Sequence, residues 1–71
     1  MFNNIGKAIT YYRKALRITR AEVARKLEVS ESTIENYEKG TTLPSMDKVV
    51  RLSHFFCIST DELLSFTPIS K

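Results

Sequence analysis

The stretch I-T-R-A-E-V-A-R-K-L-E-V-S-E-S-T-I-E-N-Y-E-K-G, which runs from Ile18 to Gly40, predicts two short helices that meet at a tight turn. Thr19 and Glu22 have the spacing of a capping box, in which the hydroxyl accepts from a free backbone N–H and the carboxylate reaches back to the cap residue. The first helix is therefore expected from about residue 20 to residue 27. Its apolar face consists of Val23, Ala24 and Leu27. The small Ala24 side chain allows the next helix to cross closely, as a helix-turn-helix requires.

The second helix of this stretch is expected from about residue 31 to residue 38. Ser30 has the side chain of an N-cap, and Gly40 can end the helix in a left-handed conformation. Val29 is expected to fill the turn between the two helices. The inward residues are Ile34 and Tyr37, and the residues left to face outward are Glu31, Ser32, Thr33, Glu35 and Asn36.

This arrangement resembles the helix-turn-helix of the Cro and lambda-repressor type, the XRE-like family of small bacterial and phage regulators. The matching residues are Arg20-Ala21-Glu22-Val23-Ala24, Leu27, Val29-Ser30, Thr33-Ile34, Tyr37-Glu38-Lys39-Gly40, Leu43-Pro44-Ser45 and Ile58-Ser59-Thr60-Asp61-Glu62-Leu63-Leu64. The likeness covers roughly residues 4 to 66. It implies an all-α, compact five-helix fold and a transcriptional regulator that places one helix in the major groove of double-stranded DNA.

The flanking sequence supplies the other three helices. Residues 5–16 carry an apolar stripe of Ile5, Ile9, Tyr12 and Leu16, with Asn3 or Asn4 as the cap. Residues 46–56 follow the cap Ser45 and are expected to turn inward Met46, Val49, Leu52 or Ser53, and Phe56. Residues 60–66 follow Ser59, which forms a second capping-box pattern with Glu62, and Pro68 ends this helix. We expect a domain over residues 1–66 and a short tail over 67–71.

Two residues depart from the glycines that the family usually has at helix ends. Glu28 ends the first helix of the central stretch, and Cys57 ends the 46–56 helix. A residue other than glycine in a left-handed cap is strained by about 1 kcal/mol. Both turns are therefore expected to form at a small loss of stability.

Composition limits the class of protein. The chain has 71 residues, a net charge of +3 and a single cysteine, so we expect one domain and no internal disulfide. It has neither a long apolar run nor a signal-peptide pattern, and a cytoplasmic location without a membrane partner is expected. Residues 1–17 hold four basic side chains and no acid. Such a basic end suits DNA phosphates but does not by itself identify a DNA-binding protein.

The expected recognition helix is acidic, with Glu31, Glu35 and Glu38 before its first basic residue, Lys39. The family resemblance implies an ion pair between Arg13 and Glu38, which would remove one acid from the exposed surface. Glu35 is expected towards the side of the helix. Glu31 either accepts a hydrogen bond from a cytosine amine or repels the DNA.

The resemblance also implies which residues touch DNA. The expected base contacts are Glu31, Ser32, Thr33 and Asn36, of which Asn36 suits adenine and the Thr33 methyl suits thymine. The expected phosphate contacts are Arg20, Lys39, Thr41, Thr42 and Ser45, together with the start of the 46–56 helix. The alternative for the two threonines is ordinary turn chemistry.

More apolar surface is present than five short helices easily bury. The residues concerned are Phe55, Ile58, Leu64, Phe66 and Ile69. They predict a homodimer contact near the last helix. A two-fold dimer would bind a palindromic operator with half-sites about 34 Å apart.

No enzyme is expected. His54 and Cys57 are too few for a four-ligand zinc site, and they are interpreted as a surface histidine and a small buried thiol. Asp61 and Glu62 are interpreted as capping residues, and no metal or cofactor is expected. Two alternatives stay open: a protein-interaction module on a helix-turn-helix fold, or the DNA-binding part of an antitoxin or a larger sensor-regulator with a protein partner or an additional domain.

Overall fold

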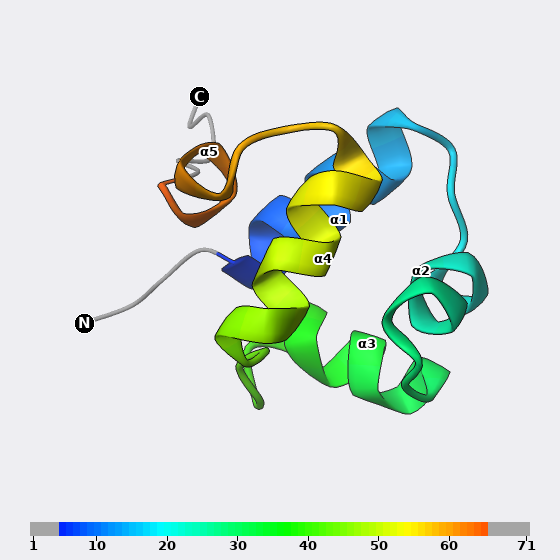
Figure 1. Cartoon of the computed structure of the whole chain (residues 1–71). Coiled ribbons are helices and arrows are strands. Elements are labelled where there is room, and N and C mark those ends of the chain that lie inside the picture. The colour runs from blue at the N-terminus through cyan, green and yellow to red at the C-terminus, as the bar shows by residue number, and fades with distance from the viewer. Residues whose placement is uncertain (1–4, 66–71) are drawn as a thin grey trace, which may run out of the picture.

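The computed structural model describes residues 5–65, which form an all-α bundle (Figure 1). Its helices are α1 (Ile5–Ala15), α2 (Arg20–Leu27), α3 (Glu31–Lys39), α4 (Met46–Phe56) and α5 (Thr60–Leu64). α3 lies at the lower side of the bundle in Figure 1, α4 crosses in front of α1, and α5 sits at the opposite, upper side. The five-helix fold expected from the sequence is confirmed, and α2 to α5 each begin directly after the expected cap; the caps expected for α1 lie outside the described residues.

Hydroxyl side chains set the starts of α2 to α5. The Oγ atoms of Ser30, Ser45 and Ser59 each accept from a backbone N–H three residues later. The Thr19–Glu22 capping box is complete in both directions. At α5 the return bond from Glu62 is not formed within residues 5–65, so the second capping box predicted from the sequence is wrong in that half.

Three residues other than glycine adopt left-handed backbone angles. Glu28 (φ 60°) and Cys57 (φ 62°) end α2 and α4, as expected. Arg17 (φ 60°) was not expected; it reverses the chain after α1. Because such conformations are strained outside glycine, the three turns depend on the packing of the helices that they join.

The core lies between α1, α3, α4 and α5 and is closed on one side by α2. It consists of Ile5, Ala8, Ile9, Val23, Ala24, Leu27, Ile34, Tyr37, Val49, Leu52, Phe56 and Leu63. Ser53 is also buried and donates its hydroxyl to the Val50 carbonyl at 2.7 Å. Leu52 and Ser53 thus both face inward, where the sequence had left the choice open.

Two predicted core residues are on the surface. Leu16 is 50% exposed because α1 ends at Ala15 and the chain then turns outward through Arg17; Ile18 packs against the core in its place. Met46 is 62% exposed because it is the first residue of α4, and the buried stripe begins one turn later at Val49. Periodicity predicted the buried stripe correctly but extended it one residue too far in each helix.

The contact between α4 and the end of α2 was not predicted from the sequence. Lys48 of α4 donates its Nζ to the carbonyl oxygen of Leu27 at 2.8 Å. Leu27 is the last residue of α2, where carbonyls lack intrahelical partners and the helix dipole is negative. The contact therefore ties α4 to the end of α2.

Within residues 5–65, no helix has the length and apolar character needed to cross a bilayer.

Candidate nucleic-acid interface

The outward face of α3 is the candidate reading surface. Glu31, Ser32 and Asn36 are exposed, and Thr33 is half-buried. The Thr33 hydroxyl lies 3.0 Å from the Ser30 hydroxyl, and they share a hydrogen bond. Since that hydroxyl is engaged at the cap, the methyl group of Thr33 is the part left for an apolar contact. The Asn36 side chain is exposed, while its backbone carbonyl accepts from Gly40 and Thr41 at the end of the helix.

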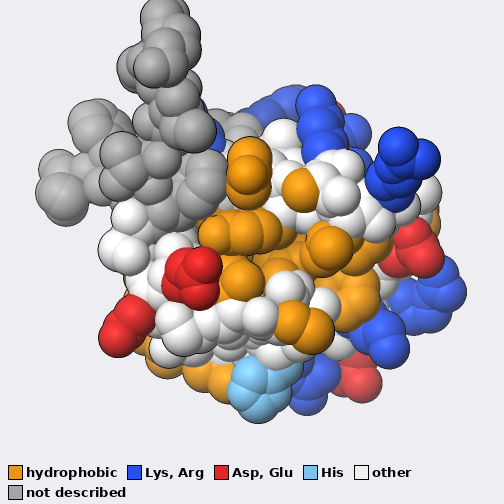
Figure 2. All heavy atoms as spheres, turned by 90° about the horizontal axis from the view of Figure 1, so that it is seen from above, with side chains coloured by type: hydrophobic (Ala, Val, Ile, Leu, Met, Phe, Trp, Pro, Cys, Tyr) orange, Lys and Arg blue, Asp and Glu red, His pale blue; other side chains and the backbone are white. Residues whose placement is uncertain are grey.

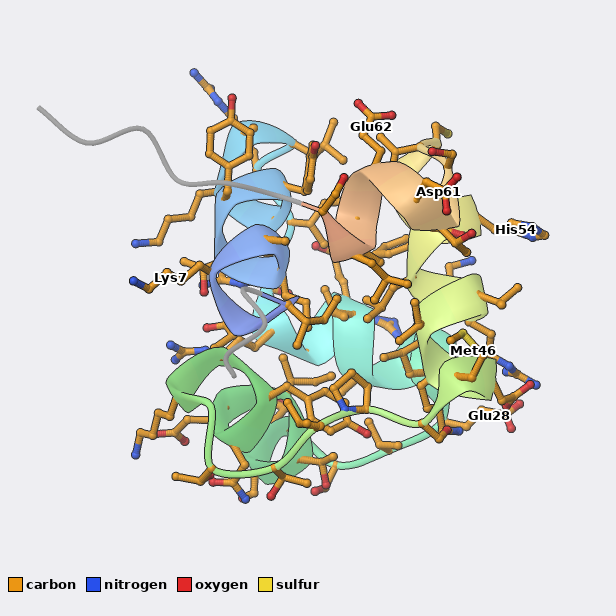
Figure 3. The ribbon with its side chains drawn as sticks, turned by 90° about the vertical axis from the view of Figure 1, so that its left-hand side faces the viewer. Lys7, Glu28, Met46, His54, Asp61 and Glu62 are labelled. Atoms are coloured by element: carbon orange, nitrogen blue, oxygen red, sulfur yellow. The ribbon has the colours of Figure 1, made fainter. Side chains whose placement is uncertain are left out.

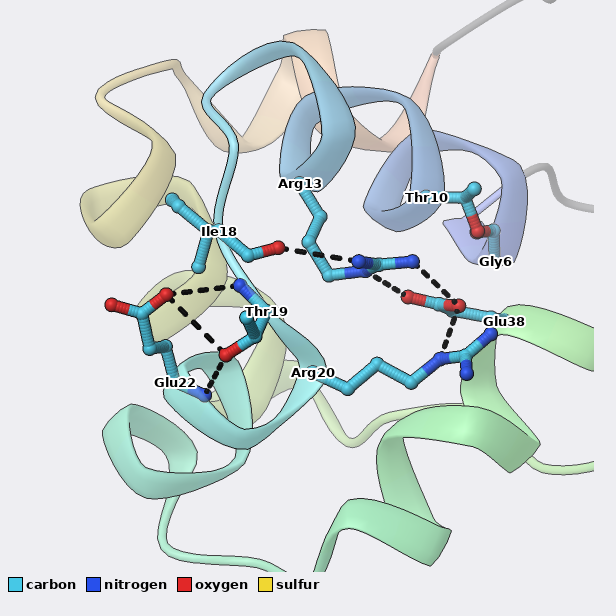
Figure 4. Close-up of polar contacts among 8 residues, drawn as sticks. All are labelled: Gly6, Thr10, Arg13, Ile18, Thr19, Arg20, Glu22 and Glu38. Carbon is cyan, nitrogen blue, oxygen red and sulfur yellow. Dashed lines mark hydrogen bonds and ion pairs between the residues drawn. The ribbon is translucent and has the colours of Figure 1, made fainter.

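The carboxylate of Glu38 accepts hydrogen bonds from two arginines (Figure 4). Its Oε2 accepts from Arg13 Nε at 2.7 Å, and its Oε1 accepts from Arg20 Nε at 3.0 Å. The Glu38 side chain is only 5% exposed, and that of Arg13 is 13% exposed. Arg13 also donates to the Ile18 carbonyl at 3.2 Å. The expected Arg13–Glu38 pair is therefore present, and Arg20, which the sequence suggested only as a phosphate contact, is a second partner of the same carboxylate.

Glu35 is paired along α3 itself. Its Oε2 lies 3.1 Å from Lys39 Nζ in an ion pair of helical spacing. The hydrogen bond from Lys39, with the charges of Lys39 and then Arg20, holds the pKa of Glu35 below its usual value. Among the three acids of α3, Glu31 alone makes no ion pair within the part of the chain that the structure describes. Two of the three acids of α3 are thus paired with basic side chains of the chain itself: Glu38 in a buried cluster and Glu35 at the surface.

The candidate phosphate contacts lie at the start of α2, where Arg20 reaches Glu38, and at the C-terminal end of α3 with the loop that follows it. Arg20 is 47% and Lys39 is 61% exposed, and Thr42 is exposed in the loop before α4. The Thr41 hydroxyl donates to the Asn36 carbonyl at 3.3 Å, so this threonine has the turn role that was the alternative reading. The exposed Ser45 caps α4 through its hydroxyl. Of the five predicted phosphate contacts, Arg20 and Lys39 are exposed but each also pairs with a carboxylate of α3, and Thr42 alone makes no side-chain hydrogen bond within residues 5–65.

The predicted dimer residues fall into separate places. Phe55 and Ile58 are half-buried against the core, and Phe55 lies under Lys26, whose Nζ is 5.9 Å from the ring centre. Leu64 is 38% exposed and lines a shallow apolar hollow of about 190 Å³. The other residues that line this hollow are Ile5, Leu43, Pro44, Met46 and Val49. Phe66 and Ile69 lie outside the described residues, as do the proposed caps Asn3 and Asn4.

Two further views show the surface of the bundle around α4 and α5. Seen from above Figure 1, hydrophobic side chains gather in the middle of the face, with charged side chains around them (Figure 2). The view from the left shows Met46 on α4 and Asp61 and Glu62 on α5 (Figure 3). Met46 and Leu64 line the hollow described above, whereas Phe55 lines a different one together with Glu22, Arg25, Lys26 and Glu28.

The residues considered for catalysis are not assembled into a site. His54 is exposed, and Cys57 is exposed rather than buried because it is the left-handed cap that turns away from the end of α4. Burial, and then the charge of Glu62, raise the pKa of Tyr12. Among residues 5–65, no three His, Cys, Asp or Glu side chains gather in an arrangement suited to a metal ion.

Sequence reasoning missed the second arginine on Glu38 and the close crossing of α1 and α3 at Gly6. A Cβ atom at Gly6 would overlap the Tyr37 carbonyl oxygen and lie 2.9 Å from the Glu38 carbonyl oxygen. The only signal in the sequence was a glycine inside a helical pattern, which is unfavourable unless packing requires it.

The chain is similar in sequence to known helix-turn-helix proteins. A family model described as helix-turn-helix matches residues 9–63. The sequence is 32% identical over 68 residues, 96% of this chain and 54% of the relative, to the HTH-type transcriptional regulator ImmR of Bacillus subtilis (strain 168). It is 34% identical over 59 residues, 83% of this chain and 53% of the relative, to the cryptic phage CTXphi transcriptional repressor RstR of Vibrio cholerae serotype O1. The chain thus spans about half the length of these curated relatives.

A solved structure has the same fold and includes DNA. The crystal structure of SinR, the master regulator for biofilm formation, in complex with DNA superimposes with a TM-score of 0.76 at 30% identity. The match covers 84% of this chain and 97% of that chain.

Proposed function

The chain belongs to the helix-turn-helix family of the Cro and lambda-repressor type, and we propose that it is a transcriptional regulator that binds a specific double-stranded DNA sequence. The observation that carries the proposal is the exposed face of α3, where Ser32 and Asn36 present polar groups, while Glu38 is paired in a buried cluster and Glu35 is paired at the surface with Lys39. The similarity to a protein solved with DNA supports it. We propose residues 1–66 as the DNA-binding domain and 67–71 as a short tail.

In the proposed complex, α3 lies in the major groove. Asn36 bonds an adenine, Thr33 offers its methyl to a thymine, and Ser32 and Glu31 contact the neighbouring bases. Phosphates are held on one side by Arg20 and on the other by Lys39, Thr41, Thr42 and the start of α4 at Ser45. The phosphate contacts set the register of the protein on the duplex, and the outward side chains of α3 select the sequence.

We further propose a two-fold dimer that binds two half-sites about 34 Å apart. A dimer on DNA must keep both α3 helices on the same side. As the contact we propose the hollow lined by Leu43, Met46 and Leu64, which lies between the α3–α4 loop, the start of α4 and α5. Phe55 and Ile58, already packed against the core, would contribute less to this contact; Phe66 and Ile69, predicted from the sequence for the same contact, lie outside the described residues.

Replacing Asn36 with alanine should weaken binding to the selected operator by about 1–3 kcal/mol and relax the preference at one base pair. The helix should remain intact, because the structural bonds of Asn36 use its backbone carbonyl, which alanine keeps. Titration of the operator and of a scrambled duplex at one salt concentration measures both affinities. His54→Ala, an exposed change on α4, is the control. An unchanged operator affinity for Asn36→Ala would mean that α3 is rotated from the proposed register.

Replacing Glu31 with methionine, which has neither the charge nor a carbonyl acceptor, should distinguish its two possible roles. If Glu31 accepts from a cytosine amine, the variant should lose the cytosine preference at one position of the selected site. If Glu31 only repels phosphates, every duplex should bind more tightly and the base preferences should stay as they are. Sequencing of duplexes retained from a random pool by the native protein and by the variant measures the difference.

A further inference from the structure

We infer that Glu38 is a positioning residue for DNA binding, because it holds the Arg20 guanidinium in place for a phosphate before the DNA arrives. The inference rests on the proposed function and deepens it at the phosphate contact. It starts from the three-residue cluster drawn in Figure 4, in which one carboxylate accepts from two arginines of different helices.

The charges of the cluster do not cancel. Arg13 and Glu38 are both largely buried and balance each other, whereas Arg20 is 47% exposed. The cluster therefore keeps one net positive charge, and that charge is carried at the surface. Arg20 is also the first residue of α2, where the helix dipole adds to the attraction for an anion.

The guanidinium group of Arg20 has N–H donors that its hydrogen bond to Glu38 does not use. Arg20 bonds Glu38 through its Nε, and an arginine has four further N–H groups on its two Nη atoms. No hydrogen bond or ion pair of these Nη groups is found within residues 5–65, so they are available to a phosphate while Nε stays on Glu38. Holding the side chain in this way removes part of the ordering that a free arginine would undergo on binding.

This role requires arginine and not merely a positive charge. Lysine would keep the charge, but its single ammonium group lacks the planar fork that faces two acceptors at once. If Glu38 positions Arg20, Arg20→Lys should therefore lose most of the affinity that Arg20→Met loses. If charge alone matters, Arg20→Lys should bind as the native protein does.

The experiment measures the dissociation constant of each variant for a non-specific duplex over a range of salt concentrations. Arg20→Met should bind about ten-fold more weakly, and its log–log salt slope should fall by about one. Arg20→Lys should lie within about three-fold of Arg20→Met. The matched controls are Arg51→Lys and Arg51→Met, because Arg51 is 45% exposed and also pairs with acids, but on α4. Circular dichroism melts check that every variant folds. All of these variants keep both Arg13 and Glu38.

An Arg20→Lys affinity closer to that of the native protein than to that of Arg20→Met would overturn the inference. So would an Arg51→Met loss as large as that of Arg20→Met, since the effect would then follow net charge alone. In both of these cases the proposed function would stand. Failure of the native protein to bind any duplex at low salt would instead overturn the proposed function, and this inference with it.

Discussion

Glu38→Ala is expected to lower the free energy of unfolding by about 3–5 kcal/mol, the loss typical of breaking a buried ion pair from one side. The reason is that the guanidinium of Arg13 would remain largely buried without its carboxylate. Arg20 would lose the same partner, but it is half-exposed and can turn to water. A domain of this size has a total stability of only about 4–10 kcal/mol. Urea unfolding followed by circular dichroism at 222 nm measures the change.

The double variant Arg13→Met/Glu38→Leu is the matched control for this prediction. A buried ion pair contributes little compared with an apolar pair of similar volume, so the double variant should be more stable than Glu38→Ala alone. If the double variant were as unstable as the sum of the two single changes, the loss would come from packing. The buried charge would then not be its cause.

Gly6→Ala is expected to destabilise the fold by about 2–4 kcal/mol, although alanine is normally the better helix former by about 1 kcal/mol. The added Cβ would overlap the Tyr37 carbonyl oxygen and crowd that of Glu38, and both are backbone atoms that cannot rotate away. α1 would have to move away from α3, and overpacking of this kind typically costs about 1–3 kcal/mol or more. The shift would also strain the Arg13–Glu38 pair, which spans the same two helices. Thermal and urea melts measure the effect.

Two other alanine variants separate the causes. Lys7→Ala changes the exposed neighbour in α1 and should be close to neutral, which isolates helix propensity. Gly40→Ala places a Cβ where no atom lies within 4 Å, but at a φ of +84°, so it should lose only about 1 kcal/mol from backbone strain. A neutral or stabilising Gly6→Ala would show that α1 and α3 do not cross as closely as in the structure.

Local features of the fold could be predicted from the sequence because local interactions determine them. Thr19, Ser30 and Ser45 begin their helices through bonds to the residue three positions on, which depend only on nearby sequence. The left-handed caps at Glu28 and Cys57 followed from the family's glycines at those positions. Leu16 and Met46 were placed wrongly because periodicity does not show at which residue a helix leaves the core: α1 ends before Leu16, and Met46 is the first residue of α4.

Contacts between distant segments could be predicted only in part. The Arg13–Glu38 pair came from the family resemblance, while Arg20 as the second partner of Glu38 required the relative placement of α2 and α3. The hydrogen bond from Lys48 to the Leu27 carbonyl and the close crossing of α1 and α3 at Gly6 also depend on how the helices are placed relative to one another. The base and phosphate contacts remain predictions, because they depend on a duplex that must be bound before they form.

The most direct test of DNA reading by α3 is selection from a random duplex pool at two salt concentrations, followed by sequencing of the retained DNA. Recovery of a palindrome with half-sites about one helical turn apart, and an affinity that falls steeply as salt rises, is the expected result. No enriched sequence even at low salt would contradict the proposal. It would favour the alternative, a protein-interaction module on the same fold.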